Sequence, residues 1–301
     1  YNRVYFIAAN AEEDMVTLKT TEIRYALAND SERLYEFLDT LTMKHDFVSV
    51  TSIGKTAEGR MIPVVTLGTG EKGNIYVGGM RAVDLISPSV LLRFICDYAE
   101  FYSAGKRMYG INMQYLWEHR IIHVIPMLNP DGYMIRRKGA DKCIMCDRLK
   151  NLNVRDGHEP NDFSEWRYNA CGKDVALSFD DTRSGNVPEA DALKNYINYY
   201  ADSLDAVLDI GADCGIVYSS GRNIPSRAKT VARLFSRMSG YQPAQSSEAC
   251  GRLTDYVIEK LGKNAYHIGC LDEGESLPES GEDYIKAYAA LREALFSCPL
   301  L

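Results

Sequence analysis

The spacing of apolar residues along the chain switches between helical and strand periods. In residues 31–41, leucine and phenylalanine recur every three or four positions and Ser31 is placed to cap the first turn, so a helix is expected. Residues 47–53 and 61–67 alternate around the polar turn 54–59, which predicts a β-hairpin. Further strands are expected at residues 74–79, 121–128, 206–210 and 265–268, and further helices at residues 87–101, 188–201, 224–239 and 281–296.

Strands that alternate with helices favour an α/β fold. We expect a mixed, mostly parallel central sheet of about eight strands with helices on both faces. The chain has no repeat, low-complexity stretch or linker, so residues 1–301 are expected to form one domain, with a less certain N-terminal extension at residues 1–30. Residues 129–132, Asn-Pro-Asp-Gly, predict a turn. Residues 136–167 show no clear period and predict a long loop that is either functional or partly disordered.

Charge and apolar content exclude two classes of partner. The chain has 34 basic and 41 acidic residues, and both signs are mixed along it, so a phosphate-neutralising face for nucleic acid is not expected. No apolar run approaches the roughly 20 residues that span a bilayer, so no membrane span is expected. The chain begins at Tyr1 without a signal-peptide pattern, which predicts a truncated N-terminus. The location stays open between the cytoplasm and the outside of the cell.

A series of segments carries a family resemblance. Residues 52–60 form a glycine- and arginine-containing hairpin, residues 126–132 contain Asn-Pro-Asp-Gly, and residues 163–174 combine a tryptophan with Gly-Lys-Asp. The other matching segments, in order, are residues 78–84, 188–193, 208–211 and 265–269. Together they resemble the M14 zinc carboxypeptidases, most closely the bacterial branch that trims γ-D-glutamyl-diamino acid peptides of the cell wall. The resemblance runs from roughly residue 30 to the end.

The resemblance implies a zinc site whose residues are replaced in this chain. The family's His-x-x-Glu ligands match Arg81 and Asp84, its later histidine ligand matches Gly211, and its catalytic glutamate matches Gly269. Arginine offers no lone pair to a metal and glycine has no side chain, so only Asp84 could ligate. The family's Asn-x-Asn segment, which helps to bind the substrate carboxylate, reads Ala-Leu-Ser at residues 176–178. We therefore expect no zinc cofactor and no catalytic residue.

These substitutions predict a catalytically inactive relative that keeps a peptide-binding cleft. Its ligand is expected to be a peptide, such as a peptidoglycan stem peptide, or a protein partner. Arg81 is expected to pair with Asp84. Arg60 either meets an anionic group of the ligand or is a solvated turn residue. The residues expected to border the former cleft are Arg60, Arg81, Asp84, Cys214, His267 and Cys270.

Two other functions stay open. One is an active hydrolase with a non-standard site, built from Asp84 with His267 or from a cysteine. The other is a structural or interaction module of a longer chain. A nucleophilic thiol would need a histidine base within hydrogen-bond reach, and His267 is the candidate nearest in sequence to Cys270.

Two further patterns suggest metal or redox chemistry. Cys143 and Cys146 form a Cys-x-x-Cys, for which unpaired thiols, a metal site with Cys171 or His158, and a disulfide all stay open, unpaired thiols being favoured. The pair His119 and His123 has a spacing that suits a metal on a helix, but His123 falls in an expected strand, which argues against a joint site.

Overall fold

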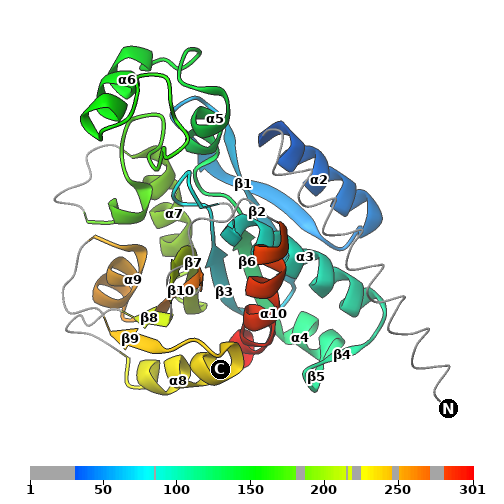
Figure 1. The fold of residues 1–301 in the computed structure, drawn as a ribbon. Coiled ribbons are helices and arrows are strands. Elements are labelled where there is room, and N and C mark those ends of the chain that lie inside the picture. The colour runs from blue at the N-terminus through cyan, green and yellow to red at the C-terminus, as the bar shows by residue number, and fades with distance from the viewer. Residues whose placement is uncertain are drawn as a thin grey trace.

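The central feature of the fold is one large mixed sheet. The computed structural model describes residues 31–84, 86–180, 187–214, 216–218, 225–245, 251–271 and 281–301. In these residues an 8-stranded sheet has the order β1-β2-β6-β3-β7-β10-β8-β9 (Figure 1). Its strands are β1 (Ser49–Lys55), β2 (Met61–Gly68), β3 (Lys72–Val77), β6 (Arg120–Ile125), β7 (Leu204–Cys214), β8 (Ile216–Tyr218), β9 (Pro243–Gln245) and β10 (Asn264–Leu271).

The middle of the sheet is parallel and its flanks are mixed. β6, β3, β7 and β10 run parallel to one another, whereas β1–β2, β2–β6 and β10–β8 are antiparallel pairs. A separate two-stranded ribbon joins β4 (Arg107–Met108) to β5 (Ile111–Asn112). The expected α/β class and the sheet of about eight strands are therefore confirmed.

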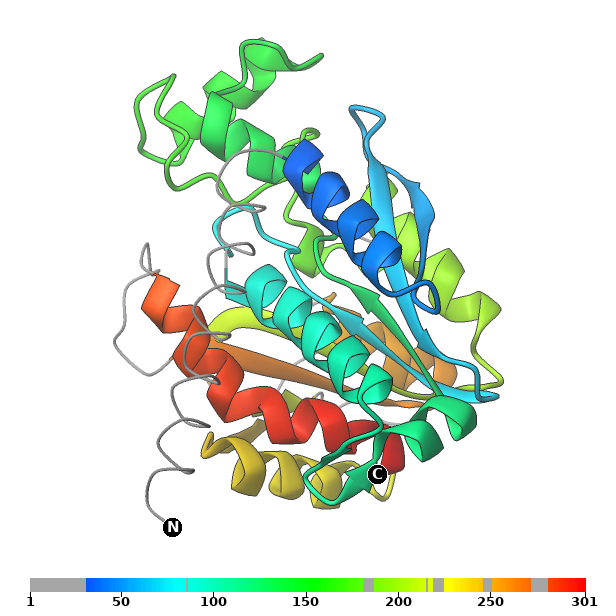
Figure 2. The same ribbon diagram turned by 90° about the vertical axis from the view of Figure 1, so that its right-hand side faces the viewer.

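Helices cover both faces of this sheet. The helices are α2 (Ser31–Lys44), α3 (Ile86–Ser103), α4 (Met113–His119), α5 (Pro130–Lys138), α6 (Cys146–Arg155), α7 (Pro188–Tyr199), α8 (Ala228–Ser239), α9 (Leu253–Leu261) and α10 (Gly281–Ser297), with the short 3₁₀ turns η1 (Val175–Leu177) and η2 (Cys298–Leu300). The largest apolar cluster joins α2, α3, α4, α8 and α10 to one face, and a second joins α7 and α9 to the other. Figure 2 shows α3, α10 and α8 lying along the same side of the sheet.

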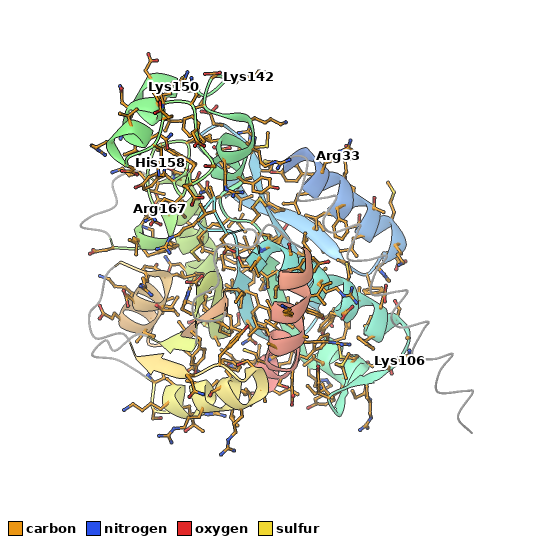
Figure 3. All side chains as sticks on the ribbon, in the orientation of Figure 1. Arg33, Lys106, Lys142, Lys150, His158 and Arg167 are labelled. Atoms are coloured by element: carbon orange, nitrogen blue, oxygen red, sulfur yellow. The ribbon has the colours of Figure 1, made fainter. Side chains whose placement is uncertain are left out.

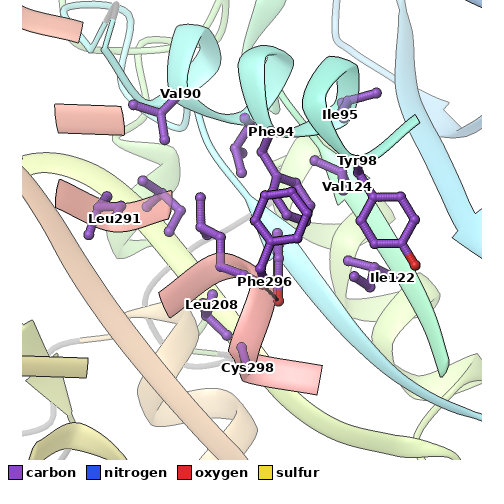
Figure 4. Packing of buried hydrophobic residues seen from close by; sticks show 14 of the residues in the cluster. Val90, Phe94, Ile95, Tyr98, Ile122, Val124, Leu208, Leu291, Phe296 and Cys298 are labelled. Atoms are coloured by element: carbon purple, nitrogen blue, oxygen red, sulfur yellow. Dashed lines mark hydrogen bonds between the residues drawn. The ribbon is translucent and has the colours of Figure 1, made fainter. Parts of the chain in front are cut away.

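Aromatic side chains fill the larger cluster. Phe94 and Tyr98 of α3 pack against Phe296 of α10, and all three are fully buried (Figure 4). Because successive strand residues face opposite sides, Leu208 and Ile210 of β7 enter this cluster. Asp209 and Gly211, which alternate with them, therefore face the α7 and α9 side.

Two expectations for the middle of the chain were wrong. Residues 129–132 form the start of α5 instead of a free turn: the Asn129 side chain accepts a hydrogen bond from Gly132 N at 2.9 Å, and Pro130 takes the first helical turn. A Cβ at Gly132 would lie 2.3 Å from the Tyr168 carbonyl oxygen, so this position needs glycine. The stretch expected to be aperiodic contains α6, whose mostly exposed residues bury only Leu149 and Asn153.

Several elements were not predicted. They are α4, α9, β4, β5, β8 and β9, all short. Helix α8 begins at Ala228, later than the expected start at residue 224, which lies outside the described residues. No described helix is long and apolar enough to cross a membrane.

Candidate functional site

The four positions that resemble the family's metal and catalytic residues lie at the carboxyl ends of central parallel strands. Arg81 and Asp84 follow the end of β3, and Gly211 and Gly269 lie late in β7 and β10. In the parallel register, Gly269 is directly opposite Gly211. The carboxyl ends of neighbouring parallel strands are where open α/β sheets place their ligands. The topology therefore brings together positions that are almost 190 residues apart in sequence.

Asp84 is engaged in holding the start of α3. Its side chain is buried, Oδ1 accepts from the backbone N of Ser87 at 3.0 Å, and Oδ2 accepts from Ser87 Oγ at 2.5 Å. Ser87 Oγ in turn accepts from Gly79 N at 2.9 Å. The carboxylate thus ties the first turn of the helix to the chain leaving β3, a structural task that uses both of its oxygens.

Arg81 contacts the segment that corresponds to the family's substrate-carboxylate region. Its Nε lies 3.3 Å from Asp174 Oδ2, and Asp174 Oδ1 accepts from Ala176 N at 3.1 Å, which caps η1. The guanidinium therefore braces residues 174–178 against the turn after β3. The expected pairing of Arg81 with Asp84 stays a prediction.

His267 fills the space at the position of the family's third ligand. Its Nδ1 is 2.8 Å from Asp209 Oδ2, and both residues are almost fully buried on opposed positions of β10 and β7. A Cβ built on Gly211 would lie 2.8 Å from His267 Cε1 and 3.4 Å from its Nε2. Such a contact is too short for real atoms, so the imidazole and a side chain at residue 211 exclude each other.

Comparison with known proteins defines the family. The profile of peptidase M14, described as zinc carboxypeptidase, matches residues 34–278. The chain belongs to the zinc carboxypeptidase family. It is 24% identical over 275 residues to γ-D-glutamyl-L-diamino acid endopeptidase 1 of Lysinibacillus sphaericus, a match that covers 85% of this chain and 69% of that protein.

Solved structures of carboxypeptidases share the fold. Thrombin-activatable fibrinolysis inhibitor superposes with a TM-score of 0.70 and 20% identity, covering 90% of this chain and 72% of the other. The metallo-carboxypeptidase of Burkholderia cenocepacia gives a TM-score of 0.60 and 18% identity, covering 88% and 68%. At these identities the similarity shows a shared fold. The chemistry of the site has to be argued from this chain's own residues.

The zinc that the family name implies does not fit the residues at this edge. Of the three ligand positions, Arg81 offers no lone pair, Gly211 has no side chain, and Asp84 is held by Ser87. In the part of the chain that the structure describes, no group of three or more His, Cys, Asp and Glu residues could hold a metal ion. The position of the general base, Gly269, also lacks a side chain.

Arg60 closes the β1–β2 hairpin onto α5. Its Nη1 lies 2.6 Å from Oδ1 of the buried Asp131, whose Oδ2 accepts from Glu58 N at 2.9 Å. The side chain is 34% exposed, so it is not a fully solvated turn residue. Its charge is already matched by Asp131, which limits what it could offer to an anionic ligand.

Cys270 is not arranged as a nucleophile. Cys270 is buried in the cluster on the α8 and α10 side, whereas His267, three residues earlier, faces the other side. Burial, aided by the nearby carboxylates of Asp84 and Asp209, raises the pKa of Cys270 well above its ordinary value. The thiol is therefore protonated and has no His267 base beside it. The side chain of Cys214 lies outside the described residues.

Cys143 and Cys146 lie at the start of α6, and both are free thiols, as is Cys171. Burial, with the Glu58 carboxylate beside it, raises the pKa of Cys143 to about 11. A protonated thiol is a poor metal ligand and a poor nucleophile, so Cys143 is not poised for either. His158, the other partner considered for a metal, lines a separate pocket.

His119 and His123 are separated by the end of a helix. His119 lies at the exposed end of α4, where its ring stacks on Tyr115. His123 is buried in β6, where Nδ1 is 2.9 Å from Tyr196 Oη, and burial lowers its pKa to about 4. A helical metal pair is therefore not formed, as the strand pattern indicated.

A pocket next to the turn after β3 was missed by the sequence. It holds about 450 Å³ and is lined by Val83, Asn153, Asp156, His158, Glu165, Trp166, Arg167 and Tyr168. Figure 3 shows the labelled His158 and Arg167 on the flank of the molecule below α6. The indole Nε1 of Trp166 is buried without a hydrogen-bond partner. Except for Val83 and Tyr168, these residues come from the stretch 136–167, which shows no clear period.

Glu189 is a second residue that the sequence did not single out as chemical. It is fully buried at the start of α7, and its Oε2 accepts from Asn169 Nδ2 at 2.7 Å while Oε1 has no partner. Burial raises the pKa of Glu189 to about 7. The group supports the chain where α7 meets the loop around Asn169, and in the described residues it belongs to no group of three or more His, Cys, Asp and Glu residues that could hold a metal ion.

Proposed function

We propose that this chain is a catalytically inactive member of the zinc carboxypeptidase family that binds a peptide without hydrolysing it. The observation that carries the proposal is that, at the third ligand position, glycine and the ring of His267 stand where the family has a ligand side chain. Gly211 has replaced the side chain, and the ring of His267, fixed by Asp209, takes up the space. Zinc activation of water needs three ligands and an open fourth position, and this edge has neither.

The alternative of an active hydrolase has less support. Asp209 and His267 form a carboxylate–imidazole pair of the kind that orients a general base. A nucleophile for that base would have to lie within hydrogen-bond reach, and the nearest candidate in sequence, Cys270, faces the other side of the sheet. Asp84 is occupied by Ser87. The pair therefore supports a structural role.

The pocket beside Val83 supports peptide binding. Arg167 supplies a cation, and the His158 imidazole and the unused Trp166 indole N–H supply hydrogen-bonding groups, which suit a carboxylate, while Glu165 would suit an ammonium group. The relative from Lysinibacillus sphaericus is named for γ-D-glutamyl-L-diamino acid peptides. Peptides of this type carry carboxylates and an amine, and we propose them as the ligand class.

Two measurements test the proposal. First, the purified chain is incubated with zinc sulfate, dialysed and analysed for metal, and then incubated with a γ-D-glutamyl-L-diamino acid peptide. We expect zinc well below one ion per chain and no released amino acid. Stoichiometric zinc that disappears in Asp84→Ala, together with release of amino acids, would refute the inactive-enzyme reading.

Second, calorimetry measures binding of the same peptide. Arg167→Ala should weaken binding about tenfold, because a charge-assisted hydrogen bond contributes about 1.5 kcal/mol. The matched control is Lys142→Ala, an exposed cation of the neighbouring region that does not line the pocket (Figure 3). Equal affinity of both variants would mean that the peptide does not bind in this pocket.

A further inference from the structure

A second cavity lies at the other end of the parallel strands. It holds about 360 Å³, within the usual size range of small-molecule sites. Its walls are residues at the starts of β3, β6, β7 and β10, the residue before α8, and the turn η2: Lys72, Asn74, Arg120, Asp205, Ala206, Arg227, Val231, Asn264, Tyr266, Cys298, Pro299, Leu300 and Leu301. Strand length separates it from Gly211 and Gly269.

Three buried polar atoms lining this cavity have no hydrogen-bond partner. They are Asn74 Oδ1, Asn264 Oδ1 and Tyr266 Oη, and both Asn74 and Tyr266 are fully buried. A buried polar atom left unsatisfied costs about 1–3 kcal/mol, so native proteins rarely leave one without water or a ligand. Three such atoms in residues that line one cavity make this cavity a candidate site for a polar ligand.

The orientation of the asparagines defines what they offer. Asn264 Nδ2 donates to the Asp205 carbonyl oxygen at 3.3 Å, and since a carbonyl can only accept, this bond leaves Asn264 Oδ1 as the unused atom. Asn74 Nδ2 donates to Cys298 Sγ at 3.4 Å, and its Oδ1 is the atom without a partner. Two unused acceptors therefore call for O–H or N–H groups on the occupant.

The charge around the cavity favours an anion. Lys72 and Arg227 are exposed, and Arg120 is joined to Asp205 by a contact of 2.8 Å between Nη1 and Oδ2. Among the side chains that line the cavity, three are cations and one is a carboxylate, in a chain whose net charge is −7. Burial raises the pKa of Tyr266, so its hydroxyl stays a donor suited to an anionic oxygen.

We infer that this cavity binds a small carboxylate that also carries amino or hydroxyl groups, such as an amino acid or a hydroxy acid. The carboxylate lies toward Lys72 and Arg227 and accepts from Tyr266 Oη, and the amino or hydroxyl group donates to the two asparagine oxygens. The inference uses none of the family's catalytic positions and does not rest on the proposed function. Peptide binding at Val83 and ligand binding here can fail separately.

The test compares three matched compounds. L-Glutamate, 2-hydroxyglutarate and glutarate are titrated at millimolar concentration into the full 301-residue chain by calorimetry. The first two should bind, and glutarate should bind at least about tenfold more weakly, because it leaves both asparagine oxygens unsatisfied. If neither L-glutamate nor 2-hydroxyglutarate binds, or if glutarate binds as well as both, the proposal is wrong.

Two conservative variants locate the binding. Tyr266→Phe should weaken the affinity about tenfold by removing one donor to the anion. Tyr98→Phe is its control, because the Tyr98 hydroxyl is equally buried and unpartnered but does not line the cavity. Arg227→Gln should weaken binding and reduce its salt dependence. Equal affinities in Tyr266→Phe and Tyr98→Phe, or a crystal structure with ligand that places only water on the three atoms, would overturn the assignment.

Discussion

The two ends of the same parallel strands differ in how their polar side chains are paired. At the carboxyl ends, Asp84 is held by Ser87, Arg81 by Asp174, and His267 by Asp209. At the amino ends, a cavity retains three unsatisfied polar atoms and an excess of cations. The named side chains at the carboxyl ends, which we call the closed end, are thus engaged within the chain, whereas three polar atoms at the amino ends have no hydrogen-bond partner in the described residues.

The largest expected effect concerns Glu189, the exception at the closed end. Its ordinary pKa is near 4.5 and its folded pKa is about 7, so the folded state binds the proton more tightly. The neutral carboxyl group therefore contributes about 3 kcal/mol to the free energy of unfolding below pH 4.5. This contribution is lost as the pH rises through about 7. Glu189→Gln should remove that loss, which urea unfolding at pH 5 and pH 8 measures.

The exposed Glu118→Gln is the control for this measurement. It should leave the difference between the two pH values unchanged. A Glu189→Gln variant that keeps the full pH-dependent loss would mean that Glu189 is ionised in the folded state at neutral pH, and that the closed end is more open to water than the buried side chain indicates.

The second effect tests whether His267 excludes a side chain at residue 211. Gly211→Ala should lower the free energy of unfolding by about 2 kcal/mol, since the new Cβ would meet the imidazole. In the background of His267→Ala, the same substitution should cost much less. Thermal or urea unfolding of the four proteins gives the coupling energy, expected to be about 1 kcal/mol or more. Additive effects would show that the ring and residue 211 do not compete for space.

A smaller effect concerns the anchor of α3. Ser87→Ala removes the hydroxyl that accepts from Gly79 N and donates to Asp84, so it should destabilise the chain by about 1–2 kcal/mol. Asp84→Asn in the same background should add less than it does alone, because the two residues share one network. Full additivity, measured by urea unfolding, would contradict the assignment of Asp84 to a structural task.

The smallest effects compare three buried tyrosines. Tyr76 Oη donates to the Leu295 carbonyl oxygen at 2.8 Å, so Tyr76→Phe should cost about 1 kcal/mol. Tyr98→Phe and Tyr266→Phe remove hydroxyls without a protein partner and should change stability by less than about 0.5 kcal/mol in ligand-free buffer. Calorimetric unfolding measures these differences. If Tyr266→Phe lowers the stability and Tyr98→Phe does not, the Tyr266 hydroxyl already binds an ordered water or a co-purified ligand.

Long elements with a clear period were predictable, and short or surface elements were not. Helix α3 and strand β6 follow their apolar patterns closely, because burial on one or both faces fixes the residue types. Helix α6 was missed because it buries few residues. Residues 129–132 were assigned to a turn because the same Asn-Pro-Asp-Gly chemistry serves both a turn and a helix cap; only the chain that follows decides between them.

For the candidate site, the sequence by itself limited which chemistry the residues can supply: arginine and glycine cannot ligate zinc in any fold. It could not determine which groups surround those residues. The pairing of His267 with Asp209, and the exclusion of a side chain at Gly211, depend on the register between β10 and β7. The cavity at the amino ends likewise depends on tertiary structure, because Asn74, Asn264 and Tyr266 meet only when the parallel strands align. Residue types limit the chemistry, and long-range pairing decides which groups share a space.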